Sequence, residues 1–171
     1  GTDYANTAGK AGMVSNTTGS NRKFLGYDGA GFPSSAVKVI ARTGDTGGIN
    51  GVFICGSGTG YADFSGYELT YASGYLYLKR WDGGAAVTVA QSPYFSGGAY
   101  VLGLELVPGM DGDPAAIKGY RYSDTGEAGP PGDETEEIAW AELDEPLPPG
   151  YVGVSHGVST AGNFWLSYAL I

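Results

Sequence analysis

A possible nucleophile lies near the end of the chain, where residues 153–157 read Gly-Val-Ser-His-Gly. This G-x-S-x-G pattern is typical of the strand-to-helix turn that presents the serine of α/β-hydrolases. A serine nucleophile needs a base, usually a histidine, and the only histidine of the chain is His156. Adjacent side chains on a strand point to opposite faces, and the residues after His156 are too rich in glycine, serine and threonine for a helix. We therefore expect that Ser155 is not a nucleophile.

A second group that could do chemistry is the carboxylates of "AELDEP", residues 141–146. Some glycoside hydrolases carry carboxylates at i, i+2 and i+4 of one strand, which directs all three toward the same substrate. Glu142 and Asp144 fit this spacing, but Glu145 is at i+3 and a proline follows it. We expect a solvated connection here, and no enzymatic activity from the chain.

Metal binding is the third possibility, because Asp111 and Asp113 of "MDGDP" are hard oxygen ligands suited to calcium. The twelve-residue calcium loop is absent, and further ligands from Asp124, Glu127, Asp133 or Glu134 would require the loops to converge. An ordinary polar turn is the favoured interpretation, with calcium as the alternative. We expect no cofactor.

The composition limits the classes of partner. The 171 residues suit one domain spanning residues 1–171, and the net charge of −9 argues against nucleic acid. No apolar stretch approaches the roughly 20 residues that span a bilayer. The lone Cys55 sits in the apolar run "GVFICG", as expected of a small buried hydrophobic residue. Because the chain begins at Gly1, we expect a processed product or an excised domain.

The elements that must position these residues are strands. With 31 glycines, 13 tyrosines and only 16% charged residues, the composition favours short strands joined by tight turns. Period-two alternation predicts strands, and no stretch shows helical periodicity. The predicted strands cover residues 36–42, 66–71, 75–81, 86–91, 100–107, 117–122, 151–155 and 164–171. "ASG" and "DGG" predict hairpins between three of them, and the acidic residues 124–145 are expected mainly in solvated loops. The fold class is therefore all-β, an antiparallel two-sheet β-sandwich of the jelly-roll type.

The order of motifs resembles the concanavalin A-like and laminin G-like jelly rolls. The resemblance rests on "GINGVFICGSGTGYADFSGYELTYASGYLYLKRWDGG", then "SGGAYVLGLELVPG", "IKGYRY", "PLPPGYVGVS" and "FWLSYALI". It covers roughly residues 36–171, and residues 1–35 would supply the first strand and an arm. The "GYVGVS" segment looks like a family strand in which glycine permits a close approach. The aspartate that the family often carries in its closing strand is missing here, so no metal role is carried over from it.

Two predicted strands carry aromatic and basic side chains on the face opposite their core residues. If Leu76, Leu78 and Ile117 enter the core, the outer faces hold seven candidate ligand-binding residues: Tyr75, Tyr77, Lys79, Trp81, Lys118, Tyr120 and Tyr122. Aromatic rings flanked by hydrogen-bonding groups suit the apolar faces and hydroxyls of sugars. The alternatives are that tyrosine is simply common in strands, or that residues 1–35 or another subunit covers this surface.

These observations predict a non-catalytic binding or adhesion module of an extracellular or virion-surface assembly, with glycan as the leading ligand. The alternative is a structural or oligomerisation module, such as a phage tail or capsid appendage or a secreted polymer subunit, whose aromatic face contacts neighbouring protein subunits.

Overall fold

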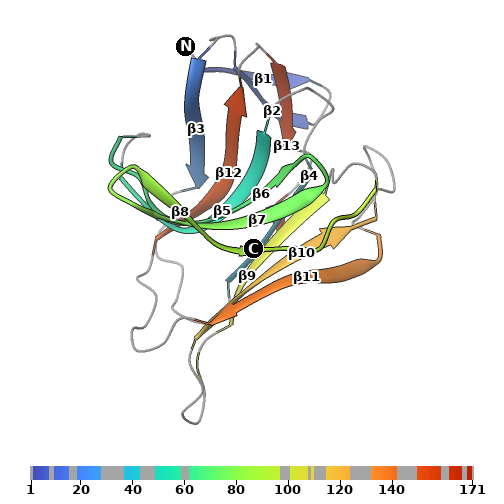
Figure 1. The fold of residues 1–171 in the computed structure, drawn as a ribbon. Coiled ribbons are helices and arrows are strands. Elements are labelled where there is room, and N and C mark those ends of the chain that lie inside the picture. The colour runs from blue at the N-terminus through green and yellow to red at the C-terminus, as the bar shows by residue number, and fades with distance from the viewer. Residues whose placement is uncertain are drawn as a thin grey trace.

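The fold is all-β and antiparallel throughout the described residues. The computed structural model describes residues 2–7, 10–15, 19–27, 37–42, 49–58, 62–96, 101–107, 109, 115–123, 132–141, 150–158, 162–166 and 169–170. A six-stranded sheet has the order β3-β12-β5-β6-β7-β8 and a five-stranded sheet the order β11-β10-β9-β4-β14 (Figure 1). This confirms the predicted antiparallel β-sandwich of the jelly-roll type.

The six-stranded sheet comprises β3 (Gly19–Tyr27), β12 (Tyr151–Val158), β5 (Ile49–Ser57), β6 (Ser65–Ala72), β7 (Tyr75–Asp82) and β8 (Ala85–Gln91). The five-stranded sheet comprises β11 (Glu134–Ala141), β10 (Ala116–Tyr122), β9 (Val101–Val107), β4 (Val37–Arg42) and β14 (Ala169–Leu170). A third, three-stranded sheet joins β1 (Thr2–Thr7), β2 (Lys10–Ser15) and β13 (Gly162–Leu166) in that order. Three strands thus occupy residues 2–27, and the predicted strand at 164–171 is divided between two sheets.

The hydrophobic core lies between the two larger sheets. Alternate residues of β7 point into it, so Leu76 and Leu78 are fully buried, as is Ile117 from β10. Residues of β5 and β9 fill the same layer, and the main cluster is Val39, Ala41, Val52, Ile54, Cys55, Tyr67, Leu69, Leu76, Leu78, Leu102, Leu104, Leu106, Ile117, Ile138, Val152 and Val154. We call the surface of each larger sheet that is turned away from this cluster its outer face.

Tight turns join β6 to β7 and β7 to β8, where the sequence predicted hairpins. Ser73 and Gly74 have φ of 52° and 84°, and Gly83 and Gly84 have the same pair of values. Two consecutive residues with positive φ form the turn that matches the twist of antiparallel strands. The position of β7 between its neighbours is therefore fixed at both ends.

One prediction for the acidic region is wrong. Residues 134–141 form β11 instead of continuing a loop, and β11 pairs with β10 along its whole length. The reason is that Ile138 is buried in the core and Trp140 packs against it, so this acidic segment also has an apolar side.

Candidate ligand-binding site

The two predicted aromatic rows lie on different sheets and face away from each other. Leu76 and Leu78 of β7 and Ile117 of β10 all point into the shared core. The alternate residues on each strand therefore lie on opposite outer faces of the sandwich. Tyr75, Tyr77, Lys79 and Trp81 belong to the six-stranded sheet, whereas Lys118, Tyr120 and Tyr122 belong to the five-stranded sheet. The structure does not bring the seven residues into one site.

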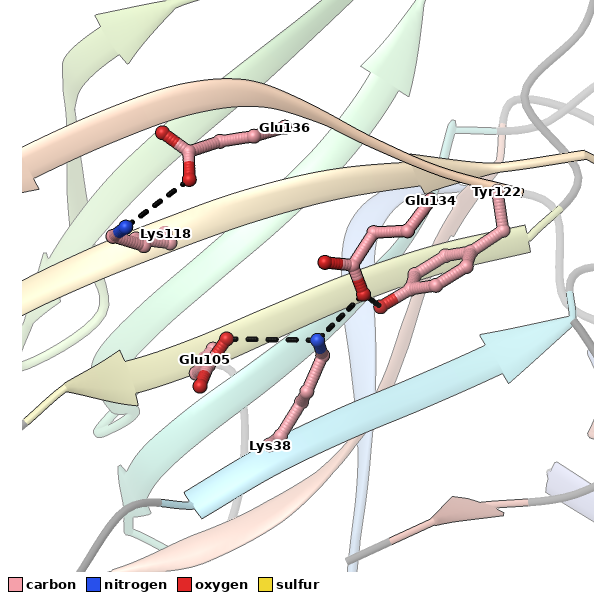
Figure 2. A network of polar contacts seen from close by, with 6 residues as sticks. All are labelled: Lys38, Glu105, Lys118, Tyr122, Glu134 and Glu136. Carbon is pink, nitrogen blue, oxygen red and sulfur yellow. Dashed lines mark hydrogen bonds and ion pairs between the residues drawn. The ribbon is translucent and has the colours of Figure 1, made fainter. Parts of the chain in front are cut away.

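The row on β10 is part of a network of polar contacts (Figure 2). The Lys38 ammonium of β4 lies 2.7 Å from Glu134 Oε2 and 3.5 Å from Glu105 Oε2. The Tyr122 hydroxyl donates a hydrogen bond of 2.5 Å to the same Glu134 oxygen. Farther along β10, Lys118 Nζ pairs with Glu136 Oε2 at 3.1 Å. The polar groups of this face are thus engaged with one another.

The tyrosine rings of β10 lie against the sheet. Tyr120 and Tyr122 are each only 6% exposed and cluster with Ile40 and Val101. The Tyr122 ring covers Gly103 so closely that a Cβ there would come within 2.6 Å of it. Lys38 Nζ sits 4.2 Å from the centre of the Tyr120 ring, a cation–π contact. Neither ring presents a free face of the kind that stacks on a sugar.

The titration behaviour of this network follows from its contacts. Burial, and next a hydrogen bond to Glu105, raise the pKa of Tyr120 well above its ordinary value. Burial by itself lowers the pKa of Lys38, but the hydrogen bond to Glu134 and the charges of Glu105 and Glu134 outweigh it, so that the pKa is raised. Hydrogen bonds from Lys38 and Tyr122 lower the pKa of Glu134. Lys38 and Glu134 are thus held in their ionised forms near neutral pH and Tyr120 in its neutral form, as in a structural ion-pair network.

On β7, the expectation that Trp81 is exposed is wrong. Trp81 does lie on the outer face, but it is only 5% exposed because Phe64, from the loop before β6, folds over it. The Phe64 and Trp81 rings meet edge to face with centroids 5.9 Å apart, and Phe53 packs against Phe64 in the same way. Trp81 Nε1 donates to Glu68 Oε2 at 2.9 Å, and Glu68 is fully buried. Trp81 is therefore part of a small second core.

The accessible aromatic group of this face is the tyrosine patch, which we define as Tyr75, Tyr77 and Tyr94. The ring centroids of Tyr75 and Tyr77 are 6.1 Å apart with the planes tilted by 49°. Tyr94 meets Tyr75 edge to face at 5.4 Å and is 65% exposed. The three rings hold one another at defined angles, which is a preorganised aromatic surface.

Backbone contacts hold Tyr94 in the patch. After β8 the chain follows β7 for a few more residues, with Ser92 N donating to Leu76 O and Phe95 N donating to Gly74 O, both at 3.0 Å. The Tyr94 ring rests on Gly74, where a Cβ would come within 2.5 Å of it. Phe95, the next residue, stacks on Tyr71 on the core side. Tyr94, the most exposed aromatic residue among those that the structure describes, thus has a backbone held by these contacts.

Hydrogen-bonding side chains of β7 and β8 flank the patch. Gln91 of β8 is exposed and lies directly across from Tyr77. Lys79 is half-buried two residues after Tyr77 on β7, and it lies across from Thr88 of β8. Amide and ammonium groups around exposed rings have the composition of a site for a polyhydroxylated ligand.

Sequence reasoning missed Tyr94. It lies outside any alternating pattern, in "SPYF" after β8, and its proximity to Tyr75 results from the backbone pairing of residues 92–95 with β7. The only available signal was an aromatic pair next to a proline.

The other sequence candidates fall into two groups. Ser155 is fully buried within β12, which continues to Val158, so the G-x-S-x-G pattern is not at a strand-to-helix turn. Cys55 is a buried thiol within the core and forms no disulfide. Outside the described residues lie the catalytic and metal candidates Asp111, Asp113, Asp124, Glu127, Glu142, Asp144 and Glu145.

Within the described residues, histidine, cysteine and carboxylate side chains form no group of three that could hold a metal. No helix in this part of the chain is long and apolar enough to cross a membrane.

Comparison with known proteins shows the kind of fold. No protein-family model and no curated protein sequence matches the chain. It is similar to the solved structure of protein SO2946, of unknown function, from Shewanella oneidensis, with 18% identity, a TM-score of 0.53 and coverage of 96% of this chain and 74% of that one. It is also similar to the TRIM65 PSpry domain, with 12% identity, a TM-score of 0.51 and coverage of 96% and 84%. The carbohydrate-binding module CBM66 from Bacillus subtilis has 14% identity, a TM-score of 0.48 and coverage of 97% and 89%.

These similarities concern the fold. They show the fold alone, a β-sandwich of the jelly-roll type. The identities are too low to carry site residues or ligands from one protein to another.

Proposed function

We propose that the chain is a non-catalytic binding module that recognises carbohydrate through the tyrosine patch. The observation that carries this proposal is Tyr94, which remains 65% exposed although its ring is held against Tyr75 and Gly74. An exposed aromatic ring that is already ordered loses little conformational entropy when a ligand stacks on it. Sugars offer apolar ring faces for stacking and hydroxyls for Gln91 and Lys79.

Of the seven residues predicted from the sequence, Tyr75, Tyr77 and Lys79 are retained in this site and Tyr94 and Gln91 are added. Trp81 is left out because it is buried under Phe64. Lys118, Tyr120 and Tyr122 are left out because they lie on the other sheet, where their polar groups already have partners.

The proposal places the chain among the concanavalin A-like and laminin G-like β-sandwiches, as part of an extracellular or virion-surface assembly. The order of the sequence motifs supports this placement, and the net charge of −9 disfavours nucleic acid as the partner. The alternative is a structural module whose tyrosine patch contacts protein, as in a phage tail or capsid appendage or a secreted polymer.

Glycan-array screening of the isolated chain, followed by calorimetry on the best ligand, tests the proposal. Tyr94→Ala should weaken binding at least about tenfold, because truncating a stacked aromatic removes more than about 1.4 kcal/mol. Tyr94→Phe should retain most of the affinity because it keeps the ring. Tyr94→Ala should change the free energy of unfolding by less than about 1 kcal/mol, since the side chain is mostly exposed.

Thr135→Ala is the matched control, because Thr135 is an exposed residue of β11 on the other sheet. It should leave both affinity and stability unchanged. A chain that binds no glycan on the array, or that binds equally well after Tyr94→Ala, would contradict the proposal. In the first case, protein contact would become the better explanation of the patch.

A further inference from the structure

Strand β8 forms an exposed edge of the six-stranded sheet. Among the described strands it pairs with β7 alone. Residues 85–88 are exposed on both faces of the strand, and Val87 keeps 65% of its surface accessible. An edge strand of this kind presents a row of backbone N–H and C=O groups that can pair with another strand.

The other edges of the two larger sheets differ from β8. The edge strand β11 carries Glu134, Glu136 and Glu137, and the edge strand β3 carries Arg22 and Lys23. The fourth edge, β14, is two residues long. Charged or very short edges resist pairing with a further strand. Seven-residue β8, "AAVTVAQ", has no charged residue, although the chain as a whole carries a net charge of −9.

The sequence of β8 is also symmetric. Residues 86–90 read Ala-Val-Thr-Val-Ala, which is the same in both directions about Thr88. In an antiparallel pair of two such strands centred on Thr88, Thr88 would face its own copy, Val87 would face Val89 and Ala86 would face Ala90. Threonine pairs and pairs of β-branched residues are favourable cross-strand neighbours. A two-fold interface requires this kind of self-complementary surface.

We propose that β8 is a homodimer interface, in which it pairs antiparallel with β8 of a second copy of this chain about Thr88. The partner is a second copy because residues 86–90 read the same in both directions, so that two copies match when antiparallel, and because β8 has no charged residue. Two chains of charge −9 could not pair through β11 without bringing glutamates together, whereas β8 permits the approach.

The geometry of the pair has two consequences. The two-fold axis of an antiparallel strand pair is perpendicular to the sheet, so the outer faces of both copies point in the same direction. The register between β7 and β8 shifts between Leu78 and Lys79, opposite Val89. Because such a bulge bends β8, the pairing of β8 with its copy is limited to a few residues. A contact of this length buries much less than a standard interface of about 1,600 Å², so we expect a dissociation constant on the order of 100 µM.

Analytical ultracentrifugation of the chain at several concentrations tests this inference without any glycan, so its failure is separate from that of the proposed function. The unmodified chain should show a monomer–dimer equilibrium. Thr88→Lys should raise the dissociation constant at least about tenfold, because it places two like charges opposite each other. Thr135→Lys, at an exposed position of β11, should leave the equilibrium unchanged.

Cross-linking tests the register itself. In Thr88→Cys, the two thiols would lie on residues whose Cα atoms are about 4.5–5.5 Å apart, within the range that a disulfide bridges. Mild oxidation by oxidised glutathione should therefore give a covalent dimer faster than in Thr135→Cys, and native Cys55 is buried and should not interfere. A chain that stays monomeric up to about 1 mM, a dimer unaffected by Thr88→Lys, or equal cross-linking rates for the two cysteine variants would each overturn the inference.

Discussion

Thr70 is fully buried on β6, and its hydroxyl is a buried side-chain group without a hydrogen-bond partner among those that the structure describes. It lies across from Tyr77 on one side and Gly51 on the other. A buried hydroxyl without a partner costs the free energy of its lost hydration. At this position valine, with nearly the same shape, would avoid that cost.

We predict that Thr70→Val leaves the free energy of unfolding unchanged or raises it by up to about 2 kcal/mol. Chemical denaturation of the purified variant measures the effect. Thr135→Val serves as control, because the hydroxyl of Thr135 is exposed and its removal should change little. A clear loss of stability in Thr70→Val alone would mean that the hydroxyl is bonded in solution.

Trp81 gives the opposite prediction. Trp81→Ala removes the packing against Phe64 and deprives buried Glu68 of a hydrogen-bond donor. We expect a loss of about 3–5 kcal/mol in the free energy of unfolding, typical of removing a large buried aromatic side chain. Trp81→Phe keeps a ring but removes the donor, and should fall between Trp81→Ala and the unmodified chain. A small effect of Trp81→Ala in thermal and chemical denaturation would show that Phe64 does not cover this ring.

At the scale of elements, the alternating pattern was enough to predict β4, β6 to β10 and β12 within a residue or two at most ends, because one face of each strand packs on the core. The pattern missed β5, whose apolar residues Val52, Phe53 and Ile54 are consecutive instead of alternating. It also missed β11, whose first residues are mostly glutamates and whose apolar residues come only near its end. The sequence also could not predict that Trp81, on the outer face of its sheet, is buried. Phe64 precedes β6 and covers Trp81 only because its loop folds back over the sheet, and this is a tertiary effect.

The network across β4, β9, β10 and β11 predicts a pH dependence of stability. The pKa of Glu134 is lowered in the folded chain from its ordinary 4.5, so its contribution to stability is present above that pH and is lost as the pH falls further. The pKa of Lys38 is raised from 10.5, so its contribution is present below that pH and is lost as the pH rises through the higher value.

Glu134→Gln should therefore destabilise the chain near neutral pH, and the difference from the unmodified chain should shrink below about pH 4. We expect about 1 kcal/mol or less at neutral pH, because the Glu134 side chain is 42% exposed and solvent screens the pair. Glu136→Gln, which breaks the more exposed pair with Lys118, should show a smaller difference. Urea unfolding at a series of pH values measures both variants, and a pH-independent difference for Glu134→Gln would contradict the assigned role.

For the molecule as a whole, we predict that calcium is dispensable. The sandwich is held by a core that spans both larger sheets, and a bound ion would add stability by mass action that chelation removes. Adding a chelator should leave the melting temperature within about a degree. A drop of several degrees that calcium reverses and Asp113→Ala abolishes would instead favour a calcium site in the segment "MDGDP".

The two sheets are joined near the tyrosine patch by the Arg121 guanidinium of β10, which lies 4.4 Å from the centre of the Phe95 ring. Arg121 is itself held by hydrogen bonds of 3.0 and 2.9 Å to Glu137 of β11. Phe95 follows Tyr94 directly, so the five-stranded sheet restricts the motion of a residue that serves the opposite face. We therefore expect the motion of Tyr94 in the free chain to be lower than that of an ordinary exposed tyrosine.

Arg121→Ala should release this restriction without touching the patch. We expect faster side-chain motion of Tyr94 by NMR relaxation and a binding entropy that becomes less favourable, because the ligand must then order the ring itself. Glu137→Gln should increase the motion of Tyr94 less, because it loosens Arg121 without removing it. If the patch binds a ligand as proposed, a cation on one sheet would set the entropic cost of that binding on the other.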